Sequence, residues 1–272
     1  MITPNQMPQR FQDVIGEQVD VYEAGTTIQA VSEIPETSKI PIQNPKHWLR
    51  IADVICVYVD MVNSTGLSAV EHDRNTASAY QLFTNTAVRL FHAFEAPYID
   101  VRGDGAFALF NADQPYRAIA AAVTVKTFAK EVFVPKLHEL TDVDLGAHIG
   151  IDQNTVLVRK VGLKQYGNRS DRQNEVWAGK PVNMAAKLSS LAKANELIVS
   201  DRYFACVQDD YVVMSCGCEN GGTGGKSRLW EEIDVTSDPR FDFAKAHLLK
   251  SVWCARHGLE YCEAILTLDE ET

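Results

Sequence analysis

Residues 57–65 read VYVDMVNST, an apolar run that ends in the aspartate Asp60. A second run, YIDVRGDGAFALF at residues 98–110, carries Asp104 between two glycines. We predict a strand that ends near Asp60 and a hairpin with Asp104 at its tip. This arrangement can bring the two carboxylates together. Paired carboxylates are suitable ligands for a divalent cation that bridges to phosphate groups, so the pattern indicates metal-dependent phosphate chemistry.

Helical and strand patterns continue outward from these two segments. Strands are predicted at residues 53–59, 98–103, 105–110, 145–152, 155–161, 196–200, 211–214 and 228–235. Helices are predicted at residues 67–95 as two helices, at 115–140, at 181–194, and at 241–265 as one helix or a pair. This order predicts an α+β fold with one antiparallel-rich sheet and helices on its face.

The composition limits the class of protein. With 272 residues, 46% of them hydrophobic, the chain can form one large domain with appendages. A net charge of −10 argues against nucleic-acid binding. The sequence has no apolar stretch of transmembrane length, and its first residues, MITPNQMPQRFQDVIG, lack the apolar core of a signal peptide. We therefore expect a cytoplasmic protein, not bound to a membrane, with reduced cysteines.

A third segment reads VWAGKPVNMAAKL, at residues 176–188. Pro181 is suited to the first turn of a helix. Asn183 and Lys187 are four residues apart, so both side chains lie on one face of the predicted helix. A fourth segment, GAHIGI at residues 146–151, contains His148, which we interpret as a packed structural histidine rather than a catalytic base.

Together these segments resemble the class III nucleotide cyclases, the adenylate and guanylate cyclase family. That family carries Asp-Ile-x-Gly-x-Thr near its start, Gly-Asp on the following hairpin and Gly-x-x-Val-Asn-x-Ala-x-Arg on a helix. The matching residues here are Asp60, Thr65, Gly103, Asp104, Asn183 and, in place of the arginine, Lys187. The resemblance implies a ferredoxin-like core. We divide the chain into an N-terminal arm that packs on the body (1–46), a cyclase catalytic domain (47–238) and a Cys-containing C-terminal helical extension (239–272).

The resemblance also implies a mechanism, in which the ribose 3′-oxygen attacks the α-phosphorus and expels pyrophosphate. Asp60 and Asp104 would hold two Mg²⁺ or Mn²⁺ ions, together with the backbone carbonyl of Met61. Asn183 would orient the ribose, and Lys187 would contact phosphate. In this family the helix that carries the last two residues reaches the site of the other subunit. A head-to-tail homodimer with two equivalent sites is therefore expected.

Further residues are candidates for substrate contacts. Asp100 stands four residues before Asp104, where adenylate cyclases carry a lysine that donates to adenine. A carboxylate can instead accept from uracil N3–H or from guanine N–H groups. Tyr58 would narrow the pocket, Arg102 could donate to a pyrimidine carbonyl, and Lys226 is a candidate for the β- and γ-phosphates. These features look like the bacterial pyrimidine cyclases of Pycsar anti-phage systems, which signal to a separate cyclic-nucleotide-sensing effector, and Asp100 favours UTP.

Alternatives remain open at this point. The substrate could be CTP, GTP or ATP, and Tyr58 could be an aromatic core residue. A regulatory cyclase homologue that binds nucleotide without turnover is a rival. Lys187 favours that rival, whereas the presence of both aspartates argues against it. A diguanylate cyclase, which has a related core, is a third option, but its Gly-Gly-Asp/Glu-Glu-Phe hairpin is absent from the sequence.

Five of the six cysteines lie after residue 205. The Cys-x-Cys and Cys-x-x-His spacings offer the soft ligands that tetrahedral Zn²⁺ prefers. We hypothesise a structural zinc site formed by Cys216, Cys218, Cys254 and His257. The alternative is that the cysteines, including Cys262, pack as small apolar residues beneath a C-terminal helix.

Overall fold

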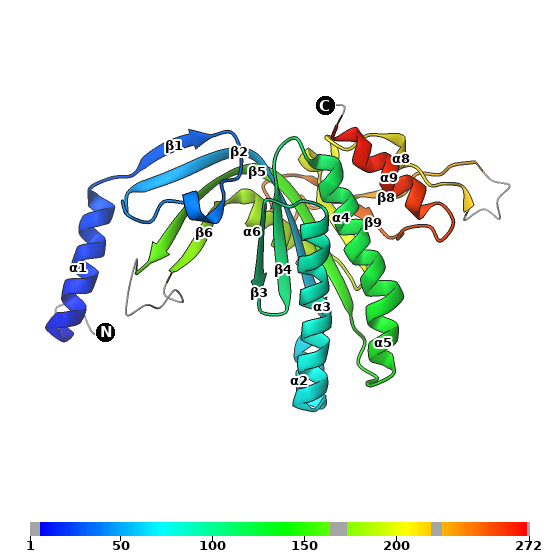
Figure 1. Ribbon diagram of the computed structural model, residues 1–272, viewed down its shortest axis with the longest axis horizontal. Helices are drawn as coiled ribbons and strands as arrows, with labels where there is room; N and C mark the ends of the chain where they lie inside the picture. The colour runs from blue at the N-terminus through cyan, green and yellow to red at the C-terminus, as the bar shows by residue number, and fades with distance from the viewer. Residues whose placement is uncertain (1–5, 164–172, 219–224, 271–272) are drawn as a thin grey trace. The chain divides into compact units, whose positions relative to one another are not determined.

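The computed structural model describes residues 6–163, 173–218 and 225–270. It divides into two compact units (Figure 1). The first contains Met1–Ala52 and Val156–Ala178, and the second contains Asp53–Thr155 and Gly179–Thr272. The second unit holds every residue that the sequence predicts to bind metal or substrate. Within the three described ranges, no helix is long and apolar enough to cross a lipid bilayer.

The described residues form one sheet of nine strands. These are β1 (Thr27–Val31), β2 (His47–Val62), β3 (Tyr98–Arg102), β4 (Gly105–Phe110), β5 (Gly146–Gly162), β6 (Gln173–Gly179), β7 (Glu196–Ser200), β8 (Trp230–Asp234) and β9 (Lys245–Leu249). The order is β3-β4-β2-β5-β7-β9-β8, with β1 also paired to β2 and β6 to β5. The β3–β4, β2–β4, β7–β9 and β8–β9 pairs are antiparallel, whereas β1–β2 and β5–β7 are parallel.

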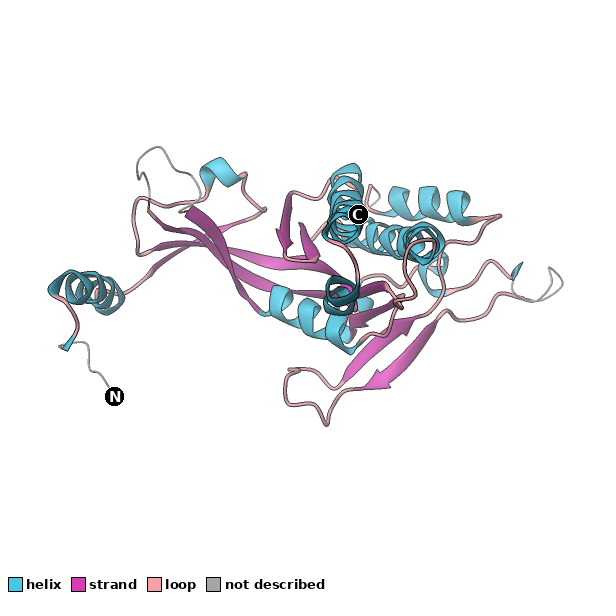
Figure 2. Ribbon diagram, turned by 90° about the horizontal axis from the view of Figure 1, so that it is seen from below, coloured by secondary structure: helices cyan, strands magenta, loops and turns pink. Residues whose placement is uncertain are grey.

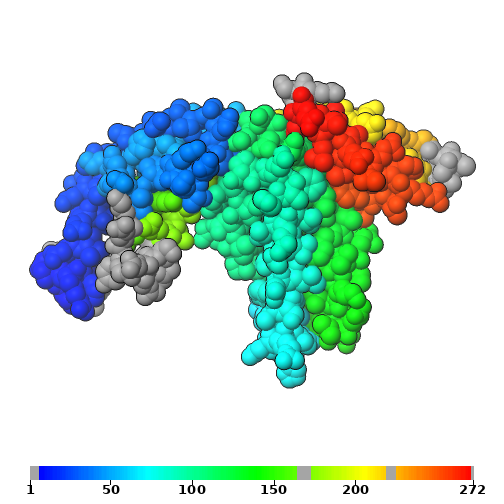
Figure 3. Space-filling view, viewed as in Figure 1, coloured from blue at the N-terminus to red at the C-terminus, as the bar shows by residue number. Residues whose placement is uncertain are grey.

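Helices lie before, between and after these strands in the sequence. They are α1 (Gln9–Glu23), α2 (Ser64–Val70), α3 (Asp73–Ala93), α4 (Pro115–Phe128), α5 (Val134–His138), α6 (Lys180–Leu191), α7 (Asp201–Phe204), α8 (Asp210–Val213) and α9 (Gly258–Leu268). A 3₁₀ turn spans Thr37–Lys39, and a π-helical turn, Ala129–Phe133, joins α4 to α5. Figure 3 shows α3 (cyan) beside the α4–α5 segment (green).

In the second unit, helices pack on both faces of the sheet (Figure 2). On one face, Val57 and Val59 of β2 and Leu197 of β7 join the main apolar core with α3 and α4. On the other face, Ile198 of β7 packs with Leu188 of α6. Successive strand residues point to opposite faces, which explains why neighbours on β7 belong to different cores. The predicted α+β class is therefore confirmed.

The hairpin around Asp104 is confirmed. β3 and β4 pair antiparallel up to Arg102 opposite Gly105. Gly103 has a φ of +66° in the intervening turn, a conformation that favours glycine. The predicted break in the first helical region is also confirmed, because α2 ends at Val70 and α3 begins at Asp73.

The second predicted hairpin is wrong. We expected strands at 145–152 and 155–161 with a turn at Asn154, but these residues form the single strand β5. The Asn154 side chain accepts a hydrogen bond from the N–H of Thr155, a local contact that leaves the strand extended. The strand continues because its first half pairs with β7 and β6 also pairs along it. Tertiary pairing thus overrides the turn signal of a single asparagine.

Two further assignments near the C-terminus are wrong. Residues 211–214 were expected to form a strand, but Asp210–Val213 form helix α8, capped by the Asp209 side chain. Within the expected helical region 241–265, Lys245–Leu249 form strand β9, and only α9 is helical. β9 lies between β7 and β8, so four of its five residues are buried. A short apolar run of this kind does not distinguish a buried strand from a helix.

The first unit contains the N-terminal elements. β1 pairs in parallel with the first part of β2, from Thr27 opposite His47 to Val31 opposite Ile51. The guanidinium carbon of Arg159 lies 5.7 Å from the ring centroid of Trp48. Helix α1 buries none of its residues within the described structure. The expectation that residues 1–46 pack on the body as an arm stays a prediction.

Candidate active site

Asp60 lies on β2, and Asp104 lies in the turn that leads into the neighbouring strand β4. Val59 of β2 lies opposite Ala106 of β4, so Asp60 follows this pair toward the turn that contains Asp104. Because Val59 faces the main core, Asp60 points to the opposite face. The structure therefore brings the two predicted metal ligands to one location.

The two carboxylates interact electrostatically. Burial, and then the negative charge of Asp104, raise the pKa of Asp60 to about 6. His148 and a hydrogen bond from the Met61 backbone N–H oppose this increase. A divalent cation would relieve the repulsion and favour the ionised form of Asp60. Hard carboxylate oxygens match Mg²⁺ or Mn²⁺, so the residues present fit the implied ions.

Gly105 leaves space for the Asp60 carboxylate. A Cβ atom at position 105 would lie 2.7 Å from Asp60 Oδ1 and 2.9 Å from the Val59 carbonyl oxygen. Both distances are too short for real atoms, and the second involves backbone that cannot rotate away. The absence of a side chain at Gly105 therefore allows the Asp60 carboxylate to occupy its observed position.

Asp100, Phe107 and Tyr58 form one row across β3, β4 and β2. Asp100 lies opposite Phe107, and Phe107 lies opposite Tyr58, so the three side chains share the face of Asp60. The Tyr58 and Phe107 rings are nearly parallel, at 8°, with centroids 6.5 Å apart. Phe107 is missed by motif reading. The hairpin register identifies it, since it must lie between two predicted base-contacting residues.

Asp100 also forms an ion pair with Arg102 of the same strand. Arg102 Nη2 lies 2.5 Å from Asp100 Oδ2, and the two side chains are 51% and 23% exposed. An ion pair this open to solvent contributes little stability, so its groups can exchange partners at low cost. The pair offers one acceptor and several donors side by side.

The Tyr58 hydroxyl lies toward the aspartates. It is 3.3 Å from the point that a Cβ on Gly105 would occupy, the same point that the Asp60 carboxylate approaches. Burial, followed by the charges of Asp60 and Asp104, raises the pKa of Tyr58. The phenol is therefore a neutral donor at the metal end of the row. Its predicted role in narrowing the base pocket stays a prediction.

Helix α6 rests directly on the backbone of β5. A Cβ on Gly150 would lie 2.0 Å from the Ala185 carbonyl oxygen and 2.5 Å from the Ser189 nitrogen. No other residue fits at position 150 without moving the helix. The contact fixes the helix against the strand.

Asn183 and Lys187 lie on the outer side of α6. Asn183 is exposed and Lys187 is partly exposed, whereas Met184 and Leu188 are buried. Lys187 Nζ donates a hydrogen bond of 2.8 Å to the Arg240 carbonyl oxygen. The two predicted catalytic residues therefore share an accessible face, as their spacing indicates.

Comparison with known proteins connects this geometry to a family. No protein-family model matches the sequence. The adenylyl cyclase CyaB from P. aeruginosa matches the fold with a TM-score of 0.58 at 16% identity, over 74% of this chain and 95% of that one. A guanylyl cyclase matches with a TM-score of 0.59 at 17% identity, over 75% and 93%.

A curated relative extends the match from fold to sequence. A uridylate cyclase from Micromonospora echinofusca is 36% identical over 236 residues, which cover 85% of this chain and 74% of the relative. This chain belongs to the class III nucleotide cyclase family. The predicted family and its cyclase core are confirmed. Because structural neighbours include both adenylyl and guanylyl cyclases, the fold alone does not determine which base the cyclase reads.

Lys226, the predicted ligand of the β- and γ-phosphates, lies next to two aromatic rings. Its Nζ is 5.8 Å from the ring centroid of Tyr211 on α8 and 5.9 Å from that of Tyr261 on α9. A cation over two aromatic faces is stabilised there. A phosphate contact by Lys226 would require it to leave these rings, and the role stays a prediction. The structure also brings the four predicted zinc ligands, Cys216, Cys218, Cys254 and His257, close to one another.

We expect Mn²⁺ binding by the cyclase to weaken as the pH falls below about 6. The pKa of Asp60 is about 6 without metal, so below that pH a proton must leave before the ion binds. For one proton the affinity should fall up to about tenfold per pH unit, and it should level off above about pH 6. Mn²⁺ titrations followed by electron paramagnetic resonance at several pH values measure this. Affinity that is constant across pH 6, or unchanged in Asp60→Asn, would contradict the assignment.

Proposed function

We propose that this cyclase converts UTP to 3′,5′-cyclic UMP and pyrophosphate by two-metal catalysis in the cytoplasm. The observation that carries the proposal is a single sheet face. It presents Asp60 and Asp104 at the strand ends and, on the same face, Asp100 paired with Arg102. The curated relative named a uridylate cyclase supports the choice of base.

Each residue of the proposed mechanism has a separate task. Asp60 and Asp104 would hold two Mg²⁺ or Mn²⁺ ions, with the Met61 carbonyl as a further oxygen ligand. Such ions, when bound, lower the pKa of the ribose 3′-hydroxyl and neutralise the triphosphate. Asn183 would orient the ribose for in-line attack on the α-phosphorus as pyrophosphate leaves. Lys187 would place positive charge on that phosphate.

Lys187 must change partner to act in this way. In the isolated chain it donates to the Arg240 carbonyl, a neutral acceptor. A phosphate oxygen is anionic and forms a stronger, charge-assisted hydrogen bond with an ammonium group. Lysine provides a point charge without the bidentate geometry of arginine, so it demands less precise alignment of the helix.

The second subunit completes the proposed site. The accessible face of α6 carries Asn183 and Lys187 outward, where they can meet the aspartates of a partner chain. A head-to-tail homodimer would then contain two equivalent sites, each with metal ligands from one subunit and phosphate contacts from the other.

The proposed base contacts follow from hydrogen-bonding capacity. Uracil offers one donor, N3–H, flanked by two carbonyl acceptors. Asp100 would accept from N3–H, and Arg102 would donate to a neighbouring carbonyl. Cytosine could use its 4-amino group as the donor to Asp100 and N3 as the acceptor. A product assay therefore has to separate the two pyrimidines.

Incubation with each of the four nucleoside triphosphates and Mn²⁺ should give cyclic UMP as the main product. Asp100→Lys should lower UTP turnover about tenfold or more, because losing a hydrogen-bonded base contact costs about 1–3 kcal/mol. Tyr58→Ala should admit purines. Val101→Lys is the matched control, since Val101 is exposed on the same strand and points to the other face.

The product profile distinguishes the outcomes of that assay. Cyclic AMP or cyclic GMP as the main product would overturn the pyrimidine assignment and leave the cyclase family unaffected. Cyclic CMP would replace the uracil contact to Asp100 with the cytosine 4-amino contact. An unchanged UTP rate in Asp100→Lys would remove Asp100 from the base site.

One observation favours a second candidate function. Lys187 stands in place of the family arginine and is hydrogen-bonded within its own chain. Both features are compatible with a cyclase homologue that binds nucleotide and signals without turnover. Tight UTP binding with no cyclic product from any triphosphate would favour this alternative.

A role in signalling follows from the proposed product. Cyclic UMP made by this cyclase would act as a second messenger for a separate cyclic-nucleotide-sensing effector in anti-phage defence. Accumulation of cyclic UMP in infected cells that express the protein, and not in cells that express Asp104→Ala, tests this role.

A further inference from the structure

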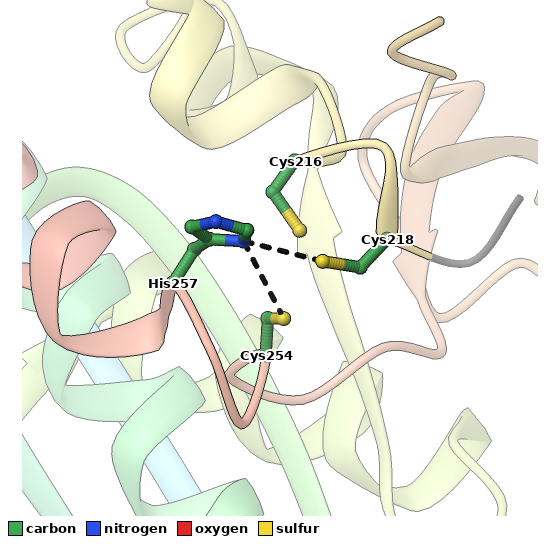
Figure 4. A group of neighbouring side chains, drawn as sticks. All are labelled: Cys216, Cys218, Cys254 and His257. Atoms are coloured by element: carbon green, nitrogen blue, oxygen red, sulfur yellow. Dashed lines mark hydrogen bonds between the residues drawn. The ribbon is translucent and has the colours of Figure 1, made fainter. Parts of the chain in front are cut away.

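Four potential metal ligands from two distant segments converge in the second unit (Figure 4). Cys216 and Cys218 lie on the loop after α8, and Cys254 and His257 lie on the turn that precedes α9. Three sulfur atoms and the His257 ring point toward one another. One ligand atom from each residue lies within 4.8 Å of all the others. Separate segments thus contribute two ligands each.

The distances match a tetrahedral zinc site. Cys218 Sγ lies 3.2 Å from His257 Nδ1, and Cys254 Sγ lies 4.0 Å from the same nitrogen. Zn–S and Zn–N bonds of about 2.3 Å and about 2.0 Å place tetrahedral ligand atoms about 3.5–3.8 Å apart. To bind one ion, Cys218 and His257 would move slightly apart, and the more widely separated ligand atoms would move slightly together.

Packing does not explain these cysteines. Cys56 is fully buried in β2 and is a typical core cysteine. Cys216, Cys218 and Cys254 are only partly buried, and all of the cysteines are free thiols. Cys216, Cys218 and Cys254 line a cavity of about 270 Å³ rather than filling it. Cys262, by contrast, lies outside the ligand cluster and packs against the main core.

The local backbone supports metal binding. Gly217 has a φ of +82°, so the chain can turn between Cys216 and Cys218 and direct both sulfurs to one side. The Arg256 N–H donates to Cys254 Sγ at 3.5 Å, a contact that stabilises a thiolate ligand. The Gly258 N–H donates to the Cys254 carbonyl at 2.7 Å and closes the turn.

We propose that Cys216, Cys218, Cys254 and His257 bind one structural Zn²⁺ ion. Four protein ligands leave no open position, so the ion would not take part in catalysis. Its effect would be to anchor the start of α9, whose preceding residue, His257, forms no side-chain cap. The far end of that helix is already held.

Asp269 provides that second attachment. Its carboxylate accepts hydrogen bonds of 2.9 Å and 2.7 Å from the N–H groups of Tyr116 and Arg117 in the first turn of α4. Ile265, 2% exposed, joins the main core between the two ends. With zinc bound, α9 would be fixed at both termini.

Metal analysis of the full-length protein tests this proposal. Protein that has been saturated with Zn²⁺ and then desalted should retain one zinc per chain. Cys254→Ser and His257→Ala should each lose most of that zinc, and chelation of the wild type should lower its melting temperature. Cys262→Ser is the matched control because it removes a cysteine from α9 outside the cluster, and it should retain one zinc.

Additional outcomes keep the test independent of catalysis. The double variant Asp60→Ala/Asp104→Ala should also retain one zinc, because these two residues are the predicted ligands of the catalytic ions and not of the zinc. Counting free thiols after denaturation with chelator should give six per chain. Absence of retained zinc in the wild type, equal retention in the Cys254 and His257 variants, or a disulfide between cluster cysteines would overturn the proposal.

Discussion

Asp60→Ala and Asp104→Ala should each abolish cyclic nucleotide production while the protein stays folded. Both carboxylates are needed to hold the metal pair, and each charge interacts with the other in the fold. Removing one preorganised electrostatic contributor typically costs about 10²–10³-fold in rate, and loss of an ion should cost at least as much. Product formation is measured by chromatography of UTP reactions, and folding by thermal denaturation.

A matched aspartate controls for the loss of charge. Asp113 is exposed beyond the opposite end of β4, so Asp113→Ala should keep wild-type activity.

The metal-free Asp60→Ala variant should be no less stable than wild type at neutral pH. The raised pKa means that ionised Asp60 is disfavoured in the fold, and this cost is complete above about pH 6 and disappears on acidification. Wild-type turnover in either site variant would refute the two-metal assignment.

Mixing two inactive variants should restore activity if the site is composite. An equimolar mixture of Asp60→Ala and Asn183→Ala should yield about a quarter of wild-type turnover. Random exchange makes half of the dimers mixed, and each mixed dimer has one intact site of two. The mixture is assayed after subunit exchange has been verified with differently tagged chains.

A second mixture provides the control for complementation. Asp60→Ala mixed with Asp104→Ala should stay inactive, because both residues belong to the same half of each site and every site then lacks one carboxylate. Activity in this mixture would indicate a different division of the site. Inactivity of the Asp60 and Asn183 mixture despite verified exchange would rule out the head-to-tail arrangement.

Local patterns predict the central part of this site well. The aspartate after a strand and the aspartate in a two-residue turn need only strand parity and hairpin geometry to be placed together. The sharing of one helix face by Asn183 and Lys187 follows in the same way from helical spacing. Each of these inferences involves residues close in sequence or joined by a short turn.

Interactions between distant segments account for what the patterns do not predict. β9 reads like part of a helix because its partners β7 and β8 are separate in sequence, and β5 continues through Asn154 because pairing outweighs one turn residue. The contacts of Lys226 with Tyr211 and Tyr261 also depend on helix packing. No spacing rule within a single segment contains that information.

Gly150 affects the proposed active site from a distance, because it sets how closely α6 packs on β5. Any side chain there would clash with the Ala185 carbonyl and move α6 relative to β5. In the proposed dimer, one such substitution would shift Asn183 and Lys187 at both sites simultaneously, while the carboxylates stayed where they are. A substitution at Gly150 would then change turnover although the residue contacts neither metal nor nucleotide. Even the single methyl group of an alanine would be enough to move the helix.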